Sequence, residues 1–98
     1  MKTLLLLLSL SLASASVASA QTTITITTAQ EDAEFMARTG ILRHCRRNGW
    51  SVEGIGMSSV SADAAIKRSC YWGLRPVREI GVARSPLTGR WYAVVRYK

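Results

Sequence analysis

The spacing of apolar residues changes along the chain, and each change marks a predicted element. In residues 21–28, Ile and Thr alternate at every second position, which is typical of an edge strand or of an extended tail. Apolar residues then recur at helical spacing, between a capping box formed by Thr28 and Glu31 and the stop signal Gly40. This pattern predicts a first helix that begins after Thr28 and ends near Gly40.

The middle of the chain predicts a short strand and then a second helix. The strand is centred on Glu53, where Gly54 and Gly56 leave room for another backbone to approach closely. Ser61 is a favourable N-cap for the helix that follows, and Gly73 is expected to close it after Trp72.

The last part of the chain predicts a β-hairpin. In residues 78–84 the apolar residues Ile80 and Val82 lie at alternate positions, and residues 85–89 (S-P-L-T-G) supply a turn. Residues 91–97 carry apolar side chains on both faces. A strand that is apolar on both faces is expected at the centre of its sheet. The chain is therefore expected to form a small α+β domain with α-β-α layers, in which two helices pack on an antiparallel sheet that includes a C-terminal β-hairpin.

Residues 1–20 have the pattern of a secretory signal peptide. Lys2 gives a basic start, a short leucine-rich run follows, and residues 18–20 (A-S-A) offer a cleavage site. The apolar run is shorter than the roughly 20 residues that span a bilayer. We therefore expect a secreted or periplasmic protein, with a tail or edge strand over residues 21–28 and one domain over residues 29–98.

The charge of the chain is strongly positive. Its formal net charge is +7, and ten of its 13 basic residues are arginines. An excess of arginine favours polyanionic partners, such as cell-envelope polymers, nucleic acid or anionic lipid. The charges are spread along the chain, however, and this is equally typical of a basic surface that has no ligand.

The two cysteines, Cys45 and Cys70, suit an oxidising compartment. We expect them to form one internal disulfide, and the alternatives are two free thiols or an intermolecular bridge. One His and two Cys at this spacing cannot complete a zinc site without carboxylates.

Several motifs follow one another in a familiar order. They are A-x-x-M-A with a trailing His44, E-G-I-G at Glu53, a helix that ends in Trp72, and the final G-R-W-Y-A-V-V-R-Y. Over roughly residues 33–97 this order resembles the CAP superfamily, the secreted domain of cysteine-rich secretory proteins, antigen 5 and pathogenesis-related 1, in its short bacterial form. The resemblance implies an α-β-α sandwich whose cavity holds two His and two Glu, which bind a divalent metal in some members.

The resemblance matches only part of that cavity. His44 corresponds to the first histidine, Glu53 to one glutamate, and Trp72 to the tryptophan that ends the middle helix. There is no second histidine and no matching second glutamate, so His44 and Glu53 form at most an incomplete site for weak binding of a metal such as zinc. In place of the missing ligands the chain has Arg75 and Arg78, which would favour an anion if they point into the cavity.

Two functions fit these observations. The first is a non-enzymatic CAP-like binding module with His44, Glu53, Trp72, Arg75 and Arg78 around its cleft, which takes a small ligand, a glycan or a protein. The second is a cationic exported protein that binds polyanions through its arginines. A hydrolase is not expected, because no nucleophile or complete metal set accompanies the histidine. The His44–Glu53 pair can equally be a purely structural contact between helix and strand.

Overall fold

The computed structural model describes residues 25–49 and 51–98. The expected signal peptide and residues 21–24 lie outside this range. Residues 25–28 form neither helix nor strand, and they lie beside the loop that follows the first helix, with the Thr27 amide donating to the Arg47 carbonyl at 3.1 Å.

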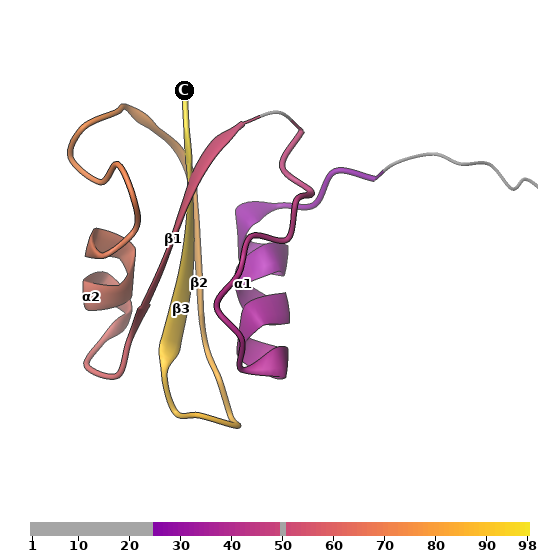
Figure 1. Cartoon of the computed structure of the whole chain (residues 1–98), viewed down its shortest axis with the longest axis vertical. Coiled ribbons are helices and arrows are strands. Elements are labelled where there is room, and N and C mark those ends of the chain that lie inside the picture. The colour runs from indigo at the N-terminus through magenta and orange to yellow at the C-terminus, as the bar shows by residue number, and fades with distance from the viewer. Residues whose placement is uncertain (1–24, 50) are drawn as a thin grey trace, which may run out of the picture.

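Two helices lie on opposite faces of a three-stranded antiparallel sheet, as Figure 1 shows. The elements in chain order are α1 (Ala29–Thr39), β1 (Val52–Ser58), α2 (Ala62–Lys67), β2 (Val77–Arg84) and β3 (Trp91–Tyr97). The strand order is β1-β3-β2, and both pairs are antiparallel. The expected α+β class, the layering, the hairpin and the central position of the last strand are all confirmed.

The ends of α1 follow the sequence signals. The Glu31 amide donates to Thr28 Oγ1 at 3.0 Å, and the Thr28 amide donates to the Glu31 carboxylate at 2.8 Å, which completes the capping box. Gly40 has a φ of 70°, and its amide donates to the Met36 carbonyl at 2.7 Å. A left-handed glycine therefore ends the helix, as predicted.

The core lies between α1 and the sheet. Strand β3 contributes Tyr92 and Val94 to this face, and α1 covers them with a row of small residues and one methionine: Ala29, Ala33, Met36 and Ala37. The close approach needs a glycine in β2, because a Cβ on Gly81 would lie 2.3 Å from the Ala29 backbone.

Helix α2 packs on the other face through the two glycines of β1. A Cβ on Gly56 would lie 2.2 Å from the Ala65 carbonyl oxygen, and one on Gly54 would lie 2.3 Å from the Cys70 carbonyl oxygen. Such distances are far shorter than any real contact, so these positions require glycine. The expected close approach of another backbone to this strand is confirmed.

Helix α2 is shorter than predicted, since it ends at Lys67 rather than near Gly73. Beyond it the chain makes successive turns, and Tyr71 has a φ of 68°. The Cys70 carbonyl accepts a hydrogen bond from the Tyr97 hydroxyl at 2.6 Å. The turns thus provide a hydrogen-bond acceptor for the hydroxyl of a buried tyrosine. This need arises from a contact that is distant in the sequence, so the helical pattern of residues 62–73 gives no sign of it.

The internal disulfide predicted from the sequence is not formed. Both cysteines are free thiols. Cys45 packs against the core on the α1 face, whereas the backbone of Cys70 lies against Gly54 on the α2 face. The sheet separates the two residues, and this explains why they do not pair.

Candidate functional site

The two residues proposed for the site from the sequence lie in direct contact. His44 Nδ1 and Glu53 Oε2 are 2.8 Å apart. The side chain of Glu53 is 2% exposed, while that of His44 is 48% exposed. An ionised carboxylate only accepts hydrogen bonds, so Nδ1 carries the proton and Nε2 is left free to meet a ligand.

The carboxylate of Glu53 also accepts a hydrogen bond from a buried arginine. Arg96 Nε donates to the other oxygen, Oε1, at 3.3 Å. The same guanidinium donates to Asp32 at 2.8 Å, to Glu79 at 3.3 Å and to the Thr27 carbonyl. Arg96, Asp32 and Glu53, which are buried, together with the partly exposed Glu79, are called the buried ion cluster below.

The buried ion cluster extends to the loop that carries His44. Asp32 is fully buried, and its second oxygen accepts from Arg47 Nη2 at 2.9 Å and from Thr27 Oγ1 at 2.6 Å. The hydrogen bond to Asp32 is the main reason that the pKa of Arg47 is raised. Carboxylates therefore hold the His44 loop at two points, with Glu53 bound to His44 and Asp32 bound to Arg47.

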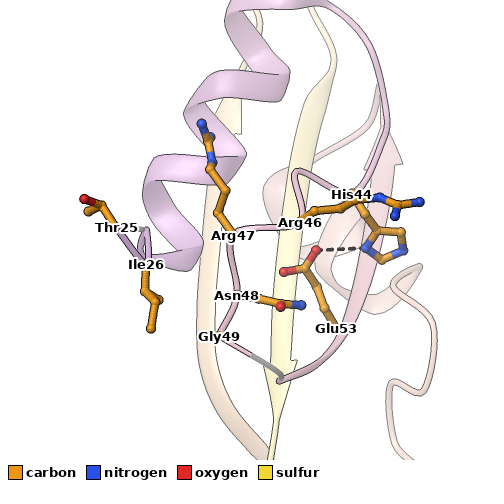
Figure 2. Close-up of a pocket in the computed structure, with 8 residues that line it drawn as sticks. All are labelled: Thr25, Ile26, His44, Arg46, Arg47, Asn48, Gly49 and Glu53. Carbon is orange, nitrogen blue, oxygen red and sulfur yellow. Dashed lines mark hydrogen bonds and ion pairs between the residues drawn. The ribbon is translucent and has the colours of Figure 1, made fainter. Parts of the chain in front are cut away.

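A cleft of about 740 Å³ opens beside His44, and Figure 2 shows its lining. The lining comes from the segment before α1, from the loop after it, and from β1: Thr25, Ile26, His44, Arg46, Arg47, Asn48, Gly49 and Glu53. In Figure 2 the ring of His44 meets the carboxylate of Glu53, while Arg47 extends towards α1, away from that pair.

The structure places Arg78 near this cleft but Arg75 and Trp72 elsewhere. Arg78 lines a smaller hollow of about 370 Å³, which shares Ile26, Asn48 and Gly49 with the cleft. Its guanidinium is engaged with the Ser51 hydroxyl and lies 3.9 Å from Glu79.

Trp72 and Arg75 line a separate hollow of about 420 Å³ that contains none of the residues of the His44 cleft. The guanidinium of Arg75 lies over the ring of Tyr71, 5.9 Å from its centroid, and donates to the Lys98 carbonyl at 3.4 Å. The hypothesis of an anion held jointly by Arg75, Arg78 and His44 therefore does not fit the geometry.

The residues present do not suit the metal that the CAP resemblance implies. Glu53 uses one oxygen for Arg96 and the other for His44, and His44 uses Nδ1 for Glu53. Within residues 25–49 and 51–98, there is no group of three or more His, Cys, Asp or Glu side chains that could hold a metal ion. The donor atoms of His44 and Glu53 are occupied by each other and by Arg96, which leaves no set of free ligands for a metal.

Cys45 adjoins the site but is not a reactive thiol. Burial, and next the negative charge of Asp32, raise the pKa of Cys45. A raised pKa keeps the thiol protonated at neutral pH, where it is a poor nucleophile and a poor metal ligand.

The residues that support the site, Asp32 and Arg96, are not among those predicted from the sequence. One signal was available: an arginine within an otherwise apolar central strand must be buried, and a buried arginine needs carboxylates.

Comparison of the chain with family models, with curated protein sequences and with solved structures finds no match. Within the part of the chain that the structure describes, neither helix has the length and apolar character needed to cross a membrane.

Proposed function

We propose that this chain is an exported, non-enzymatic binding domain that holds a small organic anion in the cleft beside His44. The observation that carries the proposal is the arrangement of His44, Glu53 and Arg96. Glu53 fixes the imidazole, Arg96 balances the charge of Glu53, and the half-exposed ring then faces the cleft. The imidazole is oriented before any ligand arrives, which lowers the cost of binding.

Arg46 supplies the positive charge of the proposed site. It lines the cleft, and its guanidinium makes no hydrogen bond or ion pair within the described residues. Its φ of 61° lies in the left-handed region, which is uncommon for a residue with a side chain. Backbone strain of this kind concentrates at functional positions, where the surrounding structure holds it in place.

The remaining lining suits a ligand with a polar and an apolar end. Asn48 donates its amide to the Ser51 carbonyl at 2.9 Å, and this leaves its side-chain oxygen as an acceptor. Ile26 contributes an apolar wall and packs against Gly49, where a Cβ would lie 2.8 Å from Ile26 Cδ1. A small carboxylic acid with a hydroxyl group would fit this lining: its carboxylate would pair with Arg46, and its hydroxyl would donate to His44 Nε2.

Binding is proposed rather than catalysis because the strongest nucleophile on this loop is unsuitable. The Cys45 thiol packs against the core and is kept protonated by burial. Membership of the CAP superfamily belongs to the same proposal. It is supported by the α-β-α layers and by the contact between His44 and Glu53, which are the two cavity residues that the resemblance matched.

An amide NMR titration with small carboxylic acids, each beside its neutral amide, tests the proposal. We expect shifts confined to residues 25–26 and 44–49 for the acids alone. They should be lost in His44→Gln and in Arg46→Gln, and kept in Arg90→Gln, which removes an exposed arginine outside the cleft. Equal binding of acid and amide, or equal weakening by all three substitutions, would contradict the proposal.

A parallel titration with Zn²⁺ addresses the metal that the resemblance implies. Because the donors of His44 and Glu53 are engaged with each other and with Arg96, we expect no shift that depends on Glu53. A localised shift that disappears in Glu53→Gln would show that the pair can open to bind a metal.

A further inference from the structure

Three arginines converge on one aromatic ring at the outer side of α1. The guanidinium carbons of Arg38, Arg43 and Arg47 lie 5.7, 5.9 and 5.0 Å from the centroid of the Phe35 ring. Arg38 is in the last turn of α1, and the other two are on the loop that follows. These four residues are called the arginine cluster below.

The arginine cluster holds three positive charges close together, and only one of them is paired with a carboxylate. Arg47 is paired with Asp32 at 2.9 Å. The guanidiniums of Arg38 and Arg43 have no hydrogen bond or ion pair within residues 25–49 and 51–98. Two exposed cations are thus held beside a third, an arrangement that an anion would stabilise.

Arg38 has a carboxylate at the favourable helical spacing and does not use it. Glu34 precedes Arg38 by four residues, the order that best supports an ion pair on a helix. The Glu34 carboxylate instead accepts from Gln30 Nε2 at 3.1 Å, and Arg38 lies over Phe35. A favourable interaction with the C-terminal end of α1 explains a basic residue at this position, but it does not explain why two loop arginines join it.

The geometry defines the chemistry of the ligand. A guanidinium that lies over a ring is held in place while its N–H groups stay available, and it binds phosphate oxygens in pairs. Three guanidiniums already lie against the Phe35 ring, so the ring is not free to stack on a nucleobase. Recognition would therefore depend on the charged group and not on a base.

We propose that the arginine cluster binds a phosphate monoester. Near neutral pH such a group carries a charge of about −1.5 to −2, which matches the two uncompensated guanidiniums. A phosphodiester carries a single charge and satisfies only one of them. This site goes beyond the cleft beside His44: the two share only Arg47, and they differ in the class of anion that each takes.

Amide NMR titrations of the purified protein with glycerol 2-phosphate, a monoester, and with dimethyl phosphate, a diester, test this proposal. We expect shifts centred on residues 35–47 for the monoester, and binding of the diester weaker by about tenfold, since one charge-assisted pair is lost. Equal affinity for the two probes, or no localised shift at tens of millimolar monoester, would overturn it.

Two substitutions that preserve the net charge separate this site from general attraction to a basic surface. Phe35→Leu removes the ring, and Arg43→Lys removes the planar fork. Each should weaken monoester binding severalfold. Arg84→Lys is the matched control and should leave monoester binding unchanged, because Arg84 makes the same kind of contact, 5.7 Å from the ring of Trp91, but without other arginines. If Phe35→Leu does not fold, Arg43→Lys decides, and unchanged affinity in that variant would overturn the proposal.

Discussion

The buried guanidinium of Arg96 is expected to be the most sensitive charged group of the fold. Its side chain is 2% exposed, and those of Asp32 and Glu53 are 0% and 2% exposed. Replacing Arg96 with Met would leave both carboxylates buried without their shared cation. Removal of one partner from a buried ion pair costs about 3–5 kcal/mol. Small domains are stable by about 5 kcal/mol or little more, so Arg96→Met should be largely unfolded.

Part of the loss should be recovered when the unpaired charges are also removed. A neutral amide costs less to bury than an unpaired carboxylate, so adding Asp32→Asn and Glu53→Gln to Arg96→Met should restore part of the stability. Urea unfolding followed by circular dichroism measures each variant, and Arg90→Met is the control for loss of an exposed arginine. If Arg96→Met lowers stability no more than Arg90→Met does, the role assigned to Arg96 is wrong.

Three further predictions concern the other face of the sheet and the thiols. Gly56→Ala should cost about 1–3 kcal/mol in urea unfolding, because its Cβ would overlap the Ala65 carbonyl; an unchanged midpoint would show that α2 can move away. Burial raises the pKa of Tyr97 above its usual 10.0, because the folded state favours the neutral phenol. The stability that the neutral phenol contributes should therefore be complete below pH 10.0 and should be lost as the pH rises through the raised pKa. Absorbance at 295 nm and unfolding at pH 8–11 measure this, and Tyr97→Phe should remove that dependence. Iodoacetamide should modify the exposed Cys70 faster than Cys45, whose pKa burial raises; equal rates, or fewer than two thiols per unfolded chain, would contradict the structure.

Local signals in the sequence were enough to predict most of the fold. Thr28, Glu31 and Gly40 act on backbone groups next to them, so their effect does not depend on tertiary context. The two apolar faces of residues 91–97 predicted a central strand, because only a strand covered on both sides can bury both sets of side chains.

The features that the sequence did not predict all depend on long-range contacts. The turns after Lys67 satisfy the hydroxyl of Tyr97, which is distant in the chain. The charge of Asp32 favours the start of α1 whether it faces solvent or the core, so its position gave no sign that it is buried against Arg96. For the site, the contact of His44 with Glu53 was expected, but the arginine that supports Glu53 was not.

The order in which the chain is made has a consequence for the buried ion cluster. Arg96 lies 64 residues after Asp32, 43 after Glu53 and 17 after Glu79. During synthesis the three carboxylates therefore leave the ribosome before their shared cation exists, and until then they favour water over the interior. A nascent chain that lacks β3 cannot close this face of the sheet, so folding awaits the last strand. Under the export proposed above, such a delay would keep the chain extended while it is still being delivered.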